Sequence, residues 1–195
     1  MTAPGRGPQG RIGLVGCVKQ QAARRTAAQD LFVAPLFRGR RIYVERTCGS
    51  WYVLSALHGL VAPGEELAPY DLKLKSLSQA ERRAWSERVL TQLEAELGDL
   101  SEFAFEIHAG ASYTNEGLVR GLRARGAAVE LPAAGLGEAQ ELAFYHEANK
   151  AAPGAVAPAD AAGVDVGIVF ELQGEMRLLD VYDPDGNRVQ LAQEL

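Results

Sequence analysis

Residues 51–71 read WYVLSALHGLVAPGEELAPYD and indicate a buried strand that ends abruptly in a polar loop. The apolar run stops at Ser55, His58 follows shortly after, and Tyr70 and Asp71 close the segment beyond two prolines. Loops that follow a rigid strand and carry hydroxyl, imidazole and carboxylate groups are common places for binding and catalysis. The segment therefore predicts a core strand and part of a functional site.

Two other predicted strands also end in reactive side chains. Residues 11–19 read RIGLVGCVK, an apolar run that leads into Cys17 and Lys19. Residues 103–110 read FAFEIHAG, a run that leads into His108, with Tyr113 shortly after. Core packing alone does not call for reactive groups at several strand ends, so we interpret these ends as one candidate site.

Strands and helices alternate along most of the chain. The apolar pattern predicts strands at 12–16, 51–56, 103–107 and 127–131, an amphipathic segment at 31–46, and helices at 78–97, 113–125 and 137–149. Ser78 and Glu81 form a capping-box signature at the start of the clearest helix, and Gly98 marks its end. The alternation predicts an α/β fold with a mostly parallel sheet and helices on both faces. Ligands bind such sheets at the carboxyl ends of the strands.

Composition predicts a cytoplasmic α/β domain with an appendage. The chain has 195 residues, 47% of them hydrophobic, and a net charge of −5. We see no membrane span and no secretory signal, and two cysteines make no disulfide framework. We divide the chain into a Gly/Pro-rich tail at 1–10, an α/β domain at 11–150, an Ala/Pro linker at 151–164 and a β appendage at 165–195.

The appendage is predicted to be a small antiparallel unit. The pattern indicates strands at 166–172, 175–182 and 188–192, with a strong turn at 183–187. So few strands bury little surface by themselves. We therefore expect the unit to dock on the main domain or to pair with another chain, as in a homodimer.

Each candidate side chain has a functional and a structural interpretation. Lys19 could hold an anion or attack a carbonyl, and Cys17 could be a nucleophile; the alternatives are a surface amine and a small buried hydrophobe. His58 could transfer a proton, contact a base edge or cap a turn, and Asp71 could be a base or a turn residue. His108 could bind a ligand or be a core histidine.

We expect Cys17 or Lys19, Ser55, His58 and His108 to line one pocket. The candidate catalytic residues are Cys17, Lys19, His58 and Asp71, and the candidate ligand-binding residues are Gly16, Ser55, Tyr70, His108, Gly110, Tyr113 and Glu138. The sequence has no zinc-ligand spacing, phosphate-loop motif or dinucleotide fingerprint. No metal or cofactor is predicted, and a nucleoside-triphosphate motor or a dinucleotide dehydrogenase is disfavoured.

A family resemblance rests on some of these same residues. The stretches at 14–19 (LVGCVK), 36–37 (LF), 54–60 (LSALHGL) and 69–72 (PYDL), with Pro63, resemble a bacterial and phage family similar to the YaaA peroxide-stress proteins. More distantly they resemble the core domain of archaeosine synthase, a tRNA base-modifying enzyme with an early Cys…Lys motif. The resemblance covers roughly 11–147 and implies an α/β fold and a theme of nucleobases and nucleic acid. Gln20 and Gln21 stand where a further basic residue is expected, which argues against a polycationic first loop.

The tail has a resemblance of its own. Residues 181–191, VYDPDGNRVQL, are similar to the last turn and strand of glyoxalase/bleomycin-resistance modules. Those modules place a metal-binding glutamate near the position of Gln190. Glutamine is a poor substitute for that ligand, so we expect no metal here.

Three functional hypotheses follow. The first is an enzyme that acts on a nucleobase, nucleoside or nucleotide by glycosidic-bond or base-substitution chemistry; Lys19 fixes an anion or attacks, His58 and Asp71 transfer protons, and Tyr70 stacks on the base. The second is a non-catalytic nucleic-acid-binding stress-response protein, and the third is an interaction module associated with a toxin or phage. A basic cluster could serve the second, or could be a solvated helix face; its members are Arg24, Arg25, Arg38, Arg40 and Arg41. The net negative charge disfavours the second hypothesis. The lack of a complete triad or metal site weighs against the first. Of the three, we favour the first.

Overall fold

The computed structural model describes residues 10–150, 176–182 and 188–194 of the chain. The chain forms two compact units, Met1–Ala151 and Ala152–Leu195. The predicted tail at 1–10, apart from Gly10, and the predicted linker at 151–164 lie outside the described residues.

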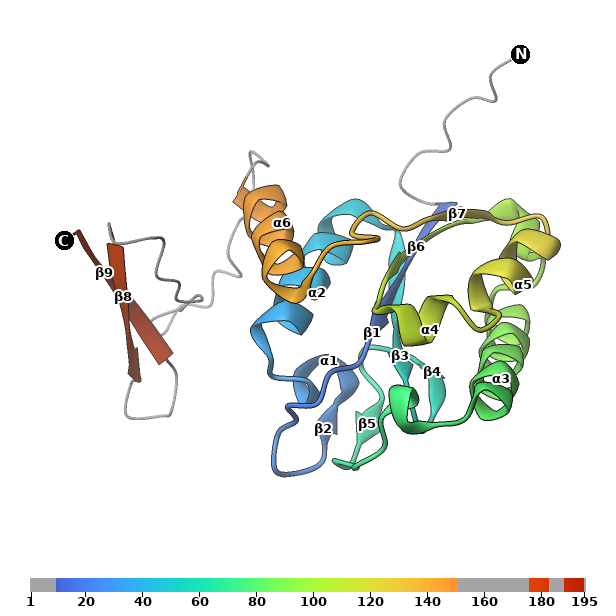
Figure 1. Ribbon diagram of the computed structural model, residues 1–195, viewed down its shortest axis with the longest axis horizontal. Coiled ribbons are helices and arrows are strands. Elements are labelled where there is room, and N and C mark those ends of the chain that lie inside the picture. Colours follow the sequence, from blue (N-terminus) through green and yellow to red (C-terminus); the bar gives the residue numbers. More distant parts are fainter. Residues whose placement is uncertain (1–9, 151–175, 183–187, 195) are drawn as a thin grey trace, which may run out of the picture. The chain divides into compact units, whose positions relative to one another are not determined.

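A five-stranded sheet forms the centre of the first unit (Figure 1). Its strands, in the order β4-β3-β1-β6-β7, are β1 (Arg11–Gly16), β3 (Ser50–Ser55), β4 (Gly59–Val61), β6 (Ala104–His108) and β7 (Ala128–Glu130). β1 pairs in parallel with β3 and β6, and β6 pairs in parallel with β7, whereas β4 runs antiparallel to β3 at one edge. The mostly parallel sheet is confirmed, and each of the four strands predicted for residues 11–150 is present within one residue of its expected bounds.

The short edge strand β4 was not expected from the sequence. Ser55 pairs with Gly59, so the chain reverses within the intervening three residues. Gly59 has a φ of 81°, a conformation that glycine adopts much more readily than other residues. The polar segment after β3 is therefore a tight hairpin rather than an open loop.

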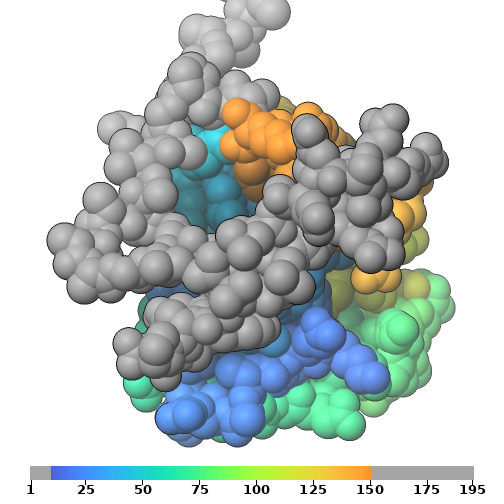
Figure 2. Space-filling view, turned by 90° about the vertical axis from the view of Figure 1, so that its left-hand side faces the viewer, coloured from blue at the N-terminus to red at the C-terminus, as the bar shows by residue number. Residues whose placement is uncertain are grey.

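Helices cover both faces of the sheet, as predicted (Figure 1). On one face α2 (Pro35–Thr47) and α6 (Glu138–Lys150) lie side by side, which the space-filling view also shows (Figure 2). On the other face lie α3 (Gln79–Leu97) and α5 (Leu118–Ala124). Successive strand residues point to opposite faces, so Leu14 joins the core beneath α3 and Val15 joins the core beneath α2. None of the described helices is long and apolar enough to cross a membrane.

The predicted helix at 113–125 is divided in two. α4 (Ala111–Thr114) ends before Gly117, whose φ of 140° lies far from helical values, and α5 begins at Leu118. Other short elements are β2 (Thr26–Ala27), α1 (Ala28–Leu31), β5 (Glu66–Leu67), and the 3₁₀ turns η2 (Leu74–Ser76) and η3 (Leu100–Glu102). β2 and β5 form a small antiparallel ladder. The amphipathic segment at 31–46 corresponds mainly to α2.

The second unit contains an antiparallel pair of strands. β8 (Met176–Tyr182) pairs with β9 (Arg188–Glu194) over its full length. The antiparallel character of the appendage is thereby confirmed. The predicted strand at 166–172 and the predicted turn at 183–187 lie outside the described residues.

The start of α3 provides a stability test. The Ser78 hydroxyl accepts the Glu81 backbone N–H at 3.3 Å, and the Glu81 carboxylate accepts the Ser78 N–H at 2.7 Å. We expect Ser78→Ala to lower the free energy of unfolding by about 1 kcal/mol, because an N-terminal N–H loses its partner. Denaturant unfolding measures the change. Thr91→Ala, at an exposed mid-helix position, is the control, and an equal loss in both variants would contradict the capping role.

Candidate ligand-binding pocket

A cavity of about 480 Å³ lies beyond the carboxyl end of β1. Its walls come from segments far apart in the sequence: the loop after β1, helix α2, the loop after β5, the start of α4 and the start of α6. The lining residues with functional groups or an accessible backbone are Cys17, Lys19, Gln21, Arg40, Tyr70, Asp71, Lys73, Lys75, Gly110, Ser112, Tyr113 and Glu138. Leu36, Leu72 and Leu74 add apolar surface.

The pocket brings together most of the predicted site residues, but not all of them. Those that line it are Cys17, Lys19, Tyr70, Asp71, Gly110, Tyr113 and Glu138. Among the described residues, the lining does not include Gly16, Ser55, His58 or His108. The expectation that Ser55, His58 and His108 share this pocket is therefore wrong, for a different reason at each position.

Two phenols and a thiol form one wall of the pocket, and a buried serine is hydrogen-bonded to one of the phenols. The Cys17 Sγ lies 2.9 Å from the Tyr113 hydroxyl, and the Tyr70 hydroxyl donates to the same sulfur at 3.5 Å. Ser55 Oγ lies 2.7 Å from the Tyr70 hydroxyl. Burial, with a further contribution from Cys17, raises the pKa of both Tyr70 and Tyr113. Both phenols are consequently protonated at neutral pH and can donate hydrogen bonds.

Ser55 and Gln21 fix the position of Tyr70 through hydrogen bonds. Ser55 is fully buried, and its Oγ also accepts the His58 backbone N–H at 3.0 Å. The Gln21 side chain accepts the Tyr70 N–H at 2.9 Å and donates to the Tyr70 carbonyl at 3.0 Å. Sequence reasoning treated Gln21 only as a missing positive charge. Its amide can both donate and accept, and this property was the sequence signal for its two hydrogen bonds to the Tyr70 backbone.

His58 is exposed in the β3–β4 hairpin rather than in the pocket. Its ring packs edge-on against Tyr70, with the ring centroids 5.6 Å apart. Its backbone N–H donates to Ser55 Oγ, so Ser55 rather than His58 supplies the side chain that caps this turn. His58 can influence the pocket only through Tyr70.

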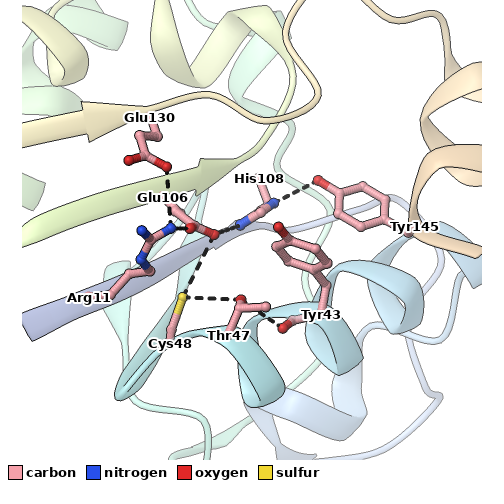
Figure 3. Close-up of polar contacts among 8 residues, drawn as sticks. All are labelled: Arg11, Tyr43, Thr47, Cys48, Glu106, His108, Glu130 and Tyr145. Carbon is pink, nitrogen blue, oxygen red and sulfur yellow. Dashed lines mark hydrogen bonds and ion pairs between the residues drawn. The ribbon is translucent and has the colours of Figure 1, made fainter. Parts of the chain in front are cut away.

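His108 is a core histidine on the face of β6 that meets α2 and α6 (Figure 3). Its Nδ1 lies 2.7 Å from the Tyr145 hydroxyl, and its Nε2 lies 3.4 Å from a carboxylate oxygen of Glu106. Burial, aided by the charge of Arg40, lowers the pKa of His108 to about 3. The imidazole is therefore neutral at neutral pH.

Glu106 extends this buried network toward the opposite end of the sheet. Its carboxylate pairs with Arg11, which also contacts Glu130 at 3.3 Å (Figure 3). The Cys48 thiol lies 3.9 Å from the same carboxylate. Burying a carboxylate is tolerated when it is paired and hydrogen-bonded, and Glu106 meets both conditions.

Gly16 has a packing role. A Cβ at this position would lie 2.7 Å from the Ala109 Cβ, closer than side-chain carbons approach. The missing side chain lets the end of β1 lie against the segment that follows β6.

Arg40 is the main pocket residue whose role the sequence did not reveal. It is only 4% exposed and binds Glu141 through Nε at 2.9 Å and Nη2 at 2.6 Å. A signal existed, because Arg40 lies on the same helical face as the buried residues Phe37 and Val44. Its partner is about a hundred positions away and could not be identified from α2 alone.

The predicted arginine cluster does not form one exposed patch. Arg24, Arg25 and Arg38 are exposed, but Arg40 is buried. Arg41 pairs with Asp30 and with Glu45, each at 2.8 Å. The five positions therefore have different roles.

The comparison with protein families gives one result. A family model described as a family of unknown function (DUF6884) matches residues 12–147. The chain belongs to this family. The searches of curated proteins and of solved structures found no match. The DUF6884 match runs from β1 into α6 and includes every residue that lines the pocket, whereas β8 and β9 lie outside it.

The DUF6884 domain offers acid–base and nucleophilic groups rather than metal ligands. Among the described residues, no group of three or more His, Cys, Asp or Glu side chains could hold a metal ion. Cys17 and Cys48 are both free thiols. What the pocket can supply is three amines, a guanidinium, a thiol, two carboxylates and two neutral phenols.

Proposed function

We propose that this DUF6884 domain is an enzyme that binds a nucleobase, nucleoside or nucleotide in the pocket and acts on its glycosidic bond or its base. One observation carries the proposal: separate segments place Lys19, Asp71, Glu138 and two phenols around one cavity. Convergence of reactive groups on a concave site is the usual basis for assigning an active site. The sequence resemblance adds the nucleobase theme.

The size and surface of the cavity suit such a ligand. Small-molecule sites commonly measure about 300–1,000 Å³, and this cavity measures about 480 Å³. Tyr70 and Tyr113 offer aromatic surface together with O–H donors, and the leucines offer apolar contact. A flat heterocycle with polar edges requires both kinds of contact.

In the proposed chemistry, charged side chains react with the ligand and the phenols assist by hydrogen bonding. Asp71 has a side chain that is 94% exposed, so ligand or water can reach its carboxylate. We assign Asp71 the role of base or nucleophile and Lys19 that of an electrophilic anchor or nucleophile. The neutral phenols can hydrogen-bond a departing base. Glu138 replaces His58 as the second candidate for proton transfer, because it lines the pocket.

A panel of substrates tests the proposal. Wild-type protein is incubated with free bases, nucleosides, and nucleoside 5′-monophosphates of ribose and deoxyribose, and the products are read by mass spectrometry. We expect at least one product that Lys19→Met removes. Lys150→Met, at an exposed position on α6 outside the pocket, is the matched control and should keep full turnover. Failure of every member of the panel to bind or react would refute the proposal.

The non-catalytic alternative predicts a different dependence on salt and on mutation. Arg24, Arg25 and Arg38 are exposed and could contact phosphates. Binding of DNA or RNA through them would weaken steeply between about 50 and 200 mM salt, and a triple Arg→Gln variant would lose it. We expect the triple variant to retain turnover. Salt-steep binding that disappears in the triple variant, without any new product from wild type, would favour the alternative.

We further propose a cytoplasmic location and a homodimer formed through the β8–β9 unit. Two strands bury little surface by themselves, which supports pairing with a second copy. Light scattering of the full chain at several concentrations measures the mass. A monomer throughout would contradict the dimer.

A further inference from the structure

We propose that the pocket takes a phosphate monoester, with the phosphoryl group held by Arg40 and flanked by Lys19, Lys73 and Lys75. This inference rests on the proposed function for the base portion of the ligand, which makes a nucleoside 5′-monophosphate the substrate class rather than a free nucleoside. The phosphate site itself stands on separate observations of burial, charge and hydrogen bonding.

Arg40 is a buried cation whose strongest contacts lie on one side. Both Nε and Nη2 bind a single carboxylate oxygen of Glu141. Nη1 reaches the Gly16 carbonyl only at 3.5 Å, the outer limit of a hydrogen bond. A guanidinium N–H that donates to a phosphate oxygen makes a charge-assisted hydrogen bond, which is stronger than a neutral one. Because Arg40 also lines the cavity, its loosely held Nη1 is the group that a phosphate would bind.

The charge of the pocket favours an anion. The lining contains four cationic side chains, Lys19, Arg40, Lys73 and Lys75, against the two carboxylates of Asp71 and Glu138. Glu141 lies outside the lining and pairs with Arg40, so the local excess of positive charge comes from the lysines. The chain as a whole carries −5, so the pocket is locally opposite in sign. Among the described residues, Lys19 and Lys75 form no ion pair, and Lys73 lies 3.9 Å from Asp71. Phosphate monoesters carry a charge near −2 at neutral pH.

A buried pair of side chains, Tyr145 and His108, is electrostatically coupled to Arg40. The Tyr145 hydroxyl lies 2.7 Å from His108 Nδ1 (Figure 3). The charge of Arg40 acts on the same hydroxyl. The neutral imidazole can accept the Tyr145 O–H, which leaves the phenol oxygen to accept from Arg40. A neutral His108 also adds no second positive charge beside Arg40. We assign His108 and Tyr145 as positioning residues for the phosphate site.

The test compares matched ligands on the full chain. Calorimetry measures the Kd of adenosine, guanosine, cytidine and uridine, each beside its 5′-monophosphate, and of inorganic phosphate and ribose 5-phosphate. In wild type, we expect the best monophosphate to bind at least about tenfold more tightly than its nucleoside, because a charge-assisted contact is gained. Arg40→Gln should remove most of this preference, a loss of about tenfold. Arg41→Gln, the neighbour outside the pocket, should preserve it.

Further variants separate binding from folding. Arg40→Gln leaves Glu141 without its cation, so Arg40→Gln/Glu141→Gln supplies a neutral pair if the single variant unfolds. Tyr145→Phe should reduce the monophosphate-to-nucleoside ratio while the nucleoside Kd stays unchanged. If Tyr145 had a purely structural role, Tyr145→Phe would instead weaken the binding of both ligands together.

The outcomes distinguish this inference from the proposed function. Equal affinity for nucleoside and monophosphate, or a preference that survives Arg40→Gln, overturns the phosphate site and leaves a nucleoside-acting enzyme standing. Arg40-dependent binding of phosphate and ribose 5-phosphate, without any gain from a base, supports the phosphate site and overturns the nucleobase assignment. No saturable binding of any ligand overturns both.

Discussion

Asp71→Asn is expected to reduce turnover of the reactive substrate by about 10²–10⁴-fold, the usual contribution of a proton-transfer residue. The variant keeps the shape of the side chain and removes its charge and basicity. Asp71 is exposed to the cavity and supports little of the core, so the free energy of unfolding should change little. Ligand affinity should fall much less than kcat. Steady-state kinetics with the substrate found in the panel, beside denaturant unfolding, measures both effects.

Two controls accompany this variant. Asp30→Asn removes an exposed carboxylate that pairs with Arg41 outside the pocket, and it should retain full turnover. His58→Ala should lower turnover by less than about tenfold, because His58 acts only through Tyr70. A larger loss of turnover in His58→Ala than in Asp71→Asn would show that the reaction takes place on the side of Tyr70 that faces His58, not in the pocket.

The second large effect is a loss of stability in mild acid caused by His108. In the folded state the pKa of His108 is lowered to about 3 from the ordinary value of 6.5, because the ring is buried and lies near Arg40. Between these values the unfolded chain binds the proton and the folded chain does not, so the free energy of unfolding falls as the pH falls. The contribution lost between neutral pH and pH 5 is about 2 kcal/mol. It is fully retained above pH 6.5 and continues to decline toward pH 3.

The window between neutral pH and about pH 5 leaves out most carboxyl groups, which titrate mainly at lower pH. Comparison with His108→Gln then isolates this residue from the other two histidines. Denaturant unfolding of wild type and His108→Gln at several pH values measures the slopes. The variant should be less stable at neutral pH, because the contact with Tyr145 changes, and should lose less stability on acidification. Parallel slopes would mean that the charged groups around the ring, Glu106 and Glu141 among them, compensate for its protonation.

The sheet could be predicted because its signals are local. Apolar runs such as 12–16 and capping signals such as Ser78 with Glu81 depend on neighbouring residues. The missed features depend on backbone geometry that the sequence does not display. Gly59 and Gly117 adopt positive φ values, which make a hairpin at one and break a helix at the other.

The pocket was partly predictable because parallel strands end at the same edge of a sheet. That rule brought Cys17, Lys19 and Tyr113 together. It failed for His108, because the rule fixes where a strand ends but not which face its last side chain occupies. It also could not find Arg40, whose burial depends on Glu141 in a distant helix.

A crystal structure with bound nucleoside 5′-monophosphate tests the central claim most directly. We expect ligand density in the cavity beyond β1, with the base against Tyr70 or Tyr113 and the phosphoryl group beside Arg40. Density for the nucleotide elsewhere on the domain, with this cavity filled only by water, would contradict it.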